Sequence, residues 1–378
     1  MILFLLGILS LYGALHFYIF SKVQGALALG PLGSTLLIVF MAAMVGAPVM
    51  VHISEKRGFE ASARLISSIG YMWMALAFLF FSFAFLLDLY RFLLSAWGPL
   101  FQRDLSHLAL SRKWAFFIPV GIAVAVAFYG YSEARGIRNE TLIIKSPKIP
   151  TEVSPLRIAQ ISDVHLGLTV RAERLKRILA VIERAKPDIL VSTGDLVDGL
   201  TDDRNGLAEL LKSIRPRYGK FAVTGNHEFY AGLDQSLRFT EQAGFTLLRG
   251  ESLTIDGIIN IAGVDDPTSR YFGLFRDVSE KDLLSSLPSA KFTLLIKHMP
   301  RVDPNARGLF DLQLSGHTHG GQLFPFSLLT RLFFPSKGLV PLSDHSYMYV
   351  NRGTGTWGPP IRFLSPPEVT VIELVHEA

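Results

Sequence analysis

Two histidines one residue apart, His317 and His319, lie between glycines in the segment 316–322. Imidazole nitrogen is a common ligand of divalent metal ions, and glycine allows the tight turns that aim two rings at one place. Apolar residues alternate with polar ones just before this segment, so it is predicted to leave the end of a buried strand. A His-x-His pair alone is weak evidence for metal binding, and its weight comes from residues elsewhere in the chain.

Carboxylates, an amide and further histidines follow four other predicted strands. In chain order these residues are Asp163, His165, Asp195, Asp198, Asn226, His227, Glu228 and His298. Open α/β sheets place their ligands at the carboxyl ends of the strands, so we expect these side chains at one rim. Taken singly, each motif also fits a helix cap, a turn or a core histidine.

Hard oxygen ligands together with histidine nitrogens suit a two-metal centre with Mn, Fe or Zn. One carboxylate would bridge ions about 4 Å apart, as in two-metal phosphatases. Such a centre produces hydroxide near neutral pH, which attacks phosphorus in line with the leaving oxygen. A neighbouring histidine outside the ligand set protonates that oxygen. The pattern therefore predicts hydrolysis of a phosphoester.

The five motifs, in this order between residues 163 and 319, resemble those of the calcineurin-like metallophosphoesterase superfamily. The form of 316–322, followed by 351–355, resembles the membrane-attached bacterial branch of that family. This branch includes phosphodiesterases and a UDP-diacylglucosamine hydrolase. The resemblance covers the C-terminal half and implies a four-layer αββα sandwich.

The resemblance also implies a role for each residue. It assigns one metal ion to Asp163, His165 and His319 and a second to Asn226, His298 and His317. Asp195 would bridge the two ions. His227 would donate the proton and Asp198 would orient it, as a carboxylate fixes an imidazole tautomer. Glu228 would support the loop.

Short apolar segments and amphipathic segments alternate in the C-terminal half. Strands are predicted at 156–161, 189–192, 221–224, 258–262, 292–296, 312–314, 347–350 and 369–374. Helices are predicted at 171–185, 207–214 and 233–243. Alternation first and strands later indicates a layered α/β sandwich.

The N-terminal part is far more apolar. Runs at 1–20, 34–51, 66–87 and 114–131 each approach the roughly 20 residues that cross a bilayer. We therefore expect a membrane region with four transmembrane helices at 1–135, a linker at 136–153 and a catalytic domain at 154–378. The first run could instead be a signal peptide, but it has no basic start and three more runs follow, which favours a retained helix.

Charge and composition limit the partners. Residues 1–135 carry 9 Lys/Arg against 5 Asp/Glu, and residues 136–378 carry 28 against 27. The near-neutral C-terminal half argues against strong nucleic-acid binding, and no nucleic-acid or protein partner is expected. The absence of cysteine excludes disulfides and thiolate metal sites. We expect a multi-pass protein of the cell membrane. Basic residues in the predicted loops are equal on the two sides, so they assign no side to the catalytic domain.

Substrate clues are fewer. Arg352 follows a predicted strand in a glycine-rich loop, where a guanidinium suits a phosphate oxygen, although it equally suits a turn cap. Lys297 and Arg301 flank His298 and would steer an anion inward. Residues 324–335 are apolar and aromatic, which fits either core or contact with a bilayer surface.

These observations favour a metal-dependent phosphoesterase in which a metal-bridging hydroxide attacks a phosphodiester or pyrophosphate. The favoured substrate is a lipid-linked or envelope-precursor molecule, and membrane lipid is an expected partner. Two alternatives stay open: a nuclease or cyclic-nucleotide phosphodiesterase, and a non-catalytic membrane sensor with the same fold.

Overall fold

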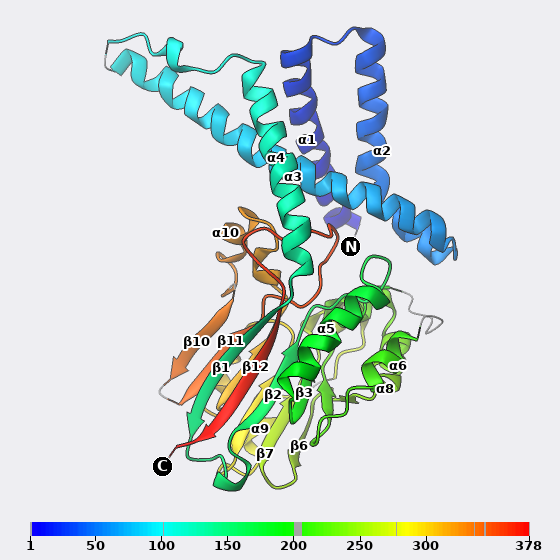
Figure 1. Ribbon diagram of the computed structural model, residues 1–378, viewed down its shortest axis with the longest axis vertical. Coiled ribbons are helices and arrows are strands. Elements are labelled where there is room, and N and C mark those ends of the chain that lie inside the picture. The colour runs from blue at the N-terminus through cyan, green and yellow to red at the C-terminus, as the bar shows by residue number, and fades with distance from the viewer. Residues whose placement is uncertain are drawn as a thin grey trace. The chain divides into compact units, whose positions relative to one another are not determined.

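The computed structural model describes residues 2–100, 102–199, 206–276, 278–335, 337–343 and 345–377 (Figure 1). The chain forms two compact units. One comprises Met1–Tyr131 with Gly358–Ile361, and the other comprises Ser132–Trp357 with Arg362–Ala378.

The first unit is helical. Its long helices are α1 (Ile2–Leu27), α2 (Pro31–Lys56), α3 (Glu60–Leu100) and α4 (Trp114–Arg135), with a short 3-10 turn η1 (Ser106–Leu108) before α4. Within the described residues, four helices are long and apolar enough to cross a membrane. Apart from Met1, which lies outside the described residues, each predicted apolar run falls in one of these helices, so the prediction of N-terminal apolar helices is confirmed. Helix α3 has 41 residues, about twice the length that a bilayer core requires.

The second unit contains two six-stranded sheets. The first has the strand order β1 (Arg138–Ser146), β12 (Glu368–His376), β2 (Leu156–Ile161), β3 (Ile189–Ser192), β4 (Lys220–Ala222) and β5 (Thr246–Leu247). The second has the order β10 (Gly338–Ser343), β11 (Ser346–Val350), β9 (Leu312–Ser315), β8 (Phe292–Ile296), β7 (Ile259–Gly263) and β6 (Glu251–Ile255).

Apolar side chains pack between the sheets and on both outer faces. Ile158 and Ile189 of the first sheet share one buried cluster with Leu294 and Leu312 of the second. Helices α5 (Ala172–Ala185), α6 (Leu207–Lys212) and α8 (Leu233–Gln242) cover the other face of the first sheet. Helix α9 (Glu280–Ser285) and the turn η5 (Pro304–Ala306) cover the second. The predicted αββα sandwich is confirmed, because each sheet buries both faces.

The segment 136–153, expected as a linker, contains the nine-residue strand β1. β1 runs parallel to β12, with Arg138 beside Glu368. Most of its side chains are exposed or half-buried, so it lacks the continuous apolar run of a central strand. Strands β5, β6 and β10 were also missed, because they are short or half-exposed and owe their pairing to tertiary neighbours.

The order of the central strands determines where the polar loops meet. β2, β3 and β4 run parallel, as do β7, β8 and β9 in the other sheet. Parallel strands place their carboxyl ends at one edge, so the loops after them gather at that edge of the sandwich. Helix α7 (Asn226–Ala231) begins there, directly after β4.

Candidate metal centre

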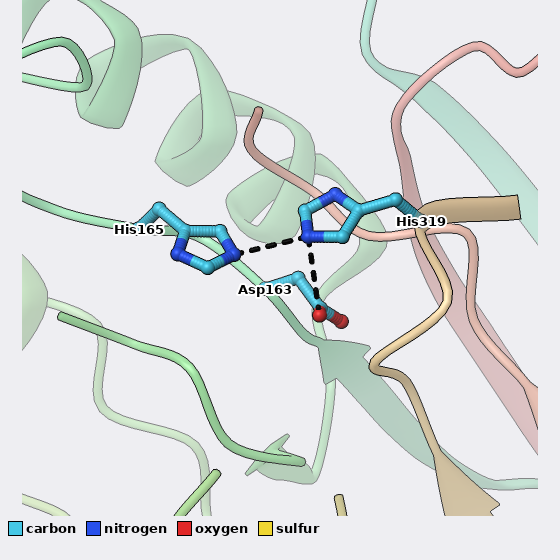
Figure 2. A group of neighbouring side chains, drawn as sticks. All are labelled: Asp163, His165 and His319. Atoms are coloured by element: carbon cyan, nitrogen blue, oxygen red, sulfur yellow. Dashed lines mark hydrogen bonds and ion pairs between the residues drawn. The ribbon is translucent and has the colours of Figure 1, made fainter. Parts of the chain in front are cut away.

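Three side chains from two distant loops converge after β2 and β9. The Nε2 atoms of His165 and His319 lie 3.0 Å apart, and His319 Nε2 lies 3.4 Å from Oδ1 of Asp163. Figure 2 shows the two rings turned toward each other beside the Asp163 carboxylate. All three residues are buried. Because the two Nε2 atoms face each other at this distance, at most one of them can carry a proton toward the other. At least one nitrogen therefore presents its lone pair to the space beside the Asp163 carboxylate.

A second group lies after β4, β8 and β9. The Asn226 side-chain oxygen is 3.2 Å from His298 Nε2 and 3.1 Å from His317 Nδ1. The two imidazole nitrogens are themselves 3.2 Å apart. This group again offers two nitrogens and one oxygen.

Asp195, after β3, lies between the two groups. Its Oδ2 is 3.1 Å from His298 Nε2 and 3.8 Å from His165 Nε2. Its Oδ1 accepts a hydrogen bond from the backbone N–H of His227 at 2.8 Å. One carboxylate oxygen therefore faces both groups, as a shared ligand requires.

The backbone at these residues is strained. Asp163, His165, Asp195, His317 and His319 have φ angles of 51°, 55°, 52°, 70° and 49°. Such left-handed conformations are uncommon outside glycine, and they cluster at sites where geometry serves function. Local sequence preference does not favour them, so the surrounding sandwich imposes them.

Two glycines allow the loops to approach closely. A Cβ atom on Gly316 would lie 1.8 Å from Oγ of Ser162, and one on Gly225 would lie 2.2 Å from Oδ1 of Asp195. Any larger residue at either position would displace the carboxylates that face the histidines.

These oxygen and nitrogen donors fit divalent metal ions. Asp163 with His165 and His319, and Asp163 with Asp195 and His298, each place their ligand atoms within 4.8 Å of one another. Buried carboxylates and neutral imidazoles are the ligand types that Mn, Fe and Zn accept. The sequence had indicated all of these residues, and the structure brings them together.

The charged groups in the centre shift one another's pKa. Burial raises the pKa of Asp195, but His298 and His227 outweigh it and hold that pKa well below the usual range. Burial lowers the pKa of His319, and Arg362 lowers it further, which keeps this ring neutral. A neutral imidazole is the form that binds metal.

His227 lies beside this centre and is paired with Asp198. Its Nδ1 is 2.5 Å from Oδ1 of Asp198, and its ring meets that of His165 edge-on at 4.6 Å between centroids. Burial lowers the pKa of His227, but Asp195 and Asp198 overcome burial and raise it to about 9. Both carboxylates therefore favour the protonated form of His227, which lies near the ligands, as a proton donor would.

Glu228 has a clearer structural role than the sequence indicated. Its buried carboxylate accepts hydrogen bonds from the backbone N–H groups of Asp195, Leu196, Val197 and Gly225, at 2.7–3.2 Å. These groups belong to the loops after β3 and β4. Glu228 therefore joins the loop that carries Asp195 to the loop that carries Asn226.

Arg362 was not identified from the sequence. It is fully buried and donates to the carbonyl oxygens of His319, Arg352 and Gly355, and its Nη2 lies 3.2 Å from Nδ1 of His319. An isolated arginine in a loop gives no local signal of such a role, and only its burial reveals it.

The three basic residues proposed for substrate differ in surroundings. Arg352 pairs with Glu368 and Glu140, and Lys297 pairs with Glu280. The guanidinium of Arg301 lies 5.0 Å from the centroid of the Phe334 ring, which packs edge-on against His317 at 5.5 Å. Arg301 is exposed, and it contacts the centre through Phe334. Among the described contacts of the three residues, those of Arg352 and Lys297 include a carboxylate, whereas those of Arg301 do not.

Comparison with known proteins gives consistent results. Residues 156–321 match the family model described as calcineurin-like phosphoesterase. The chain is 42% identical over 255 residues to an uncharacterized metallophosphoesterase of Aquifex aeolicus, covering 67% of this chain and 97% of that protein. It is 32% identical to the uncharacterized metallophosphoesterase YkuE of Bacillus subtilis, covering 68% and 93% of the two chains.

A relative from zebrafish, Danio rerio, is named transmembrane protein with metallophosphoesterase domain. It is 33% identical over 268 residues, and the match covers 67% of this chain and 61% of that protein. The chain thus spans nearly all of these two bacterial relatives and about three fifths of the vertebrate one.

Proposed function

We propose that this chain, which belongs to the calcineurin-like phosphoesterase family and is a hydrolase of phosphoester bonds, cleaves a phosphodiester or pyrophosphate with two divalent ions. The observation that carries the proposal is Asp195, whose Oδ2 faces His298 at 3.1 Å and His165 at 3.8 Å. A carboxylate in that position suits two adjacent ions rather than one.

Each ion would have its own set of ligands. Asp163, His165 and His319 would hold the first, and Asn226, His298 and His317 would hold the second. When bound, the ions supply Lewis acidity and a hydroxide near neutral pH as the nucleophile. The hydrogen bonds from Ser162 to Asp163 and from the Gly225 N–H to Glu228 would hold the ligand loops in place during the reaction.

His227 would protonate the leaving oxygen. With Nδ1 paired to Asp198, the other ring nitrogen is left for the substrate. Asp198, with Asp195 in the metal-free protein, raises the pKa of His227 to about 9, and this favours the protonated ring that a proton donor needs. A non-catalytic sensor would not need a charged imidazole outside the ligand set, so this pair supports the enzyme over that alternative.

We further propose that Arg301 contacts an anionic part of the substrate. The Arg301 guanidinium packs on the Phe334 ring, which in turn packs against His317. Arg352 and Lys297 are instead paired with carboxylates. An exposed guanidinium binds phosphate without first breaking an internal ion pair.

The substrate we propose is lipid-linked, and the chain is proposed to cross the membrane with its four apolar helices. Four helices of spanning length support that placement, as does the transmembrane relative. The near-neutral charge of residues 136–378 favours a lipid-linked substrate over a nucleic acid.

Full-length protein in nanodiscs with Mn²⁺ would test this on a chromogenic phosphodiester, a phosphomonoester, single-stranded DNA and a UDP-linked lipid. We expect turnover of the UDP-linked lipid and the chromogenic diester, and loss of both with chelator or Asp195→Ala. Preferred hydrolysis of DNA would support the nuclease instead. Wild-type turnover that persists without metal would contradict the mechanism.

A further inference from the structure

Two exposed apolar segments flank the candidate metal centre. The α10 segment, residues 324–335, contains the helix α10 (Phe326–Thr330), and its Leu332 and Phe333 are 75% and 74% exposed. The η4 segment, residues 267–275, contains the 3-10 helix η4 (Pro267–Phe272), and its Tyr271 is 90% exposed. Side chains this apolar are seldom left in water in such numbers unless they bind something.

Both segments are connected to the centre through aromatic rings. Phe334 of the α10 segment packs against the ring of His317 at 5.5 Å. Phe272 of the η4 segment lies 6.0 Å from the ring of Tyr230, which lies 5.4 Å from that of His227. Apolar surface thus begins at a candidate ligand on one side and at the proposed proton donor on the other.

A helix of membrane-spanning length ends shortly before the first strand of the sandwich. Only Gly136 and Ile137 separate the last residue of α4 from Arg138, the first residue of β1. Arg138 lies beside Glu368, and β12 pairs with β2 in an antiparallel register that matches Thr370 with Gln160. The start of β1 therefore lies at the edge of the sandwich where β2 ends, and Asp163 follows β2 at this edge.

The composition of the α10 segment fits a lipid surface. Residues 324–337 contain the basic residues Arg331 and Lys337 and no acidic residue. Aromatic and aliphatic side chains mixed with basic ones partition into the headgroup region of anionic bilayers. Binding of a protein would require neither the short connection between α4 and β1 nor a segment with basic residues and no acidic ones. A lipid surface accounts for both features.

We propose that the α10 and η4 segments insert into the surface of an anionic lipid bilayer and present the metal centre to lipid molecules there. The delivery of a lipid substrate to the centre rests on the proposed function. The contact with lipid itself does not require turnover. A substrate with acyl chains would then reach the centre without leaving the bilayer.

The contact is tested in the full-length protein in vesicles that contain phosphatidylglycerol. Because the chain has no cysteine, single cysteines at Leu332 (L332C), Tyr271 (Y271C) and Ser289 (S289C) can carry an environment-sensitive fluorophore. Ser289 is exposed and lies just before β8, at the opposite edge from the centre, so it is the matched control. Lipids with nitroxide-labelled acyl chains serve as quencher.

We expect several-fold stronger quenching at positions 332 and 271 than at 289. The same quenching is expected in an Asp195→Asn background, which abolishes turnover and thereby separates failure of the lipid contact from failure of the proposed function. Quenching at either segment that equals the Ser289 control overturns the proposal, and a protein partner would give that result.

A kinetic arm uses L332N/F333N, with Ile143→Asn on β1 as a control that is similarly exposed, at 59%. We expect about a tenfold loss of turnover for a lipid-linked diester and none for a water-soluble diester in the double variant. The control should change neither. Equal loss on both substrates in the double variant contradicts the proposal.

Discussion

The Asp198 carboxylate holds His227 with 2.5 Å between its Oδ1 and Nδ1 of the ring. The interaction joins the loop after β3 to the first turn of α7, and it gives His227 a different charge state from His319. His319 is kept neutral while His227 is charged, because different charges face the two rings.

Replacing His227 with Gln should reduce turnover of a diester with a poor leaving group by about 10²–10⁴-fold. The loss should be much smaller for a nitrophenolate ester, because that leaving group needs no proton. Steady-state kinetics on the two substrates measure the difference. His376→Gln, which removes a ring whose Nδ1 contacts the Ile149 carbonyl oxygen, is the control. Equal losses on both substrates would rule out proton donation.

The pKa of His227 should depend on the charge of Asp198. In metal-free protein its pKa should be about 9, and Asp198→Asn should lower it toward 6.5. A raised folded-state pKa means that protonated His227, facing Asp195 and Asp198, stabilises the fold fully below pH 6.5, and this contribution is lost as pH rises through 9. Carbon-labelled histidine NMR, assigned by comparison with His227→Gln, measures the pKa. An unchanged value in Asp198→Asn would show that Asp198 does not raise it.

Metal removal should abolish turnover, and two equivalents of Mn²⁺ should restore it. Asp195→Asn should weaken binding of both ions, because the Asp195 oxygen faces both ligand groups. Asn226→Ala should weaken one ion only. Calorimetric titration of the chelated protein measures the stoichiometry, and a single site in the wild-type protein would contradict the two-ion centre.

Glu228→Gln should destabilise the fold by about 1–3 kcal/mol and lower metal affinity. The amide has one acceptor oxygen in place of two, so some of the N–H groups of Asp195, Leu196, Val197 and Gly225 would lose their partner. Thermal unfolding and metal titration measure the two effects. Glu241→Gln, on the exposed side of α8, should change neither.

Arg301→Gln should raise KM by about tenfold with little change in kcat, as expected when a binding charge is removed. Arg352→Gln should instead lower thermal stability, because it leaves the buried Glu368 carboxylate without its cation. Kinetics and unfolding of both variants distinguish the roles. An unchanged KM in Arg301→Gln would exclude it from substrate binding.

The candidate site could be read from the sequence to an unusual extent. Asp163, Asp195, Asn226 and His317 follow apolar strands, and parallel strands must present their carboxyl ends together. The four apolar runs were equally readable, because crossing a bilayer demands length and low charge. In both cases the pattern lies within short stretches of the chain.

Tertiary structure decided the rest, because it depends on partners distant in the chain. β1 is a strand through its pairing with β12, which lies some 230 residues later in the register. Arg362 is significant only because burial brings its guanidinium to the His319 loop. The left-handed backbone of His165 and the 3.0 Å between its Nε2 and that of His319 arise when both sheets are packed. Residue types determined which atoms were available, and the packing and hydrogen bonds of the folded chain determined how close they lie.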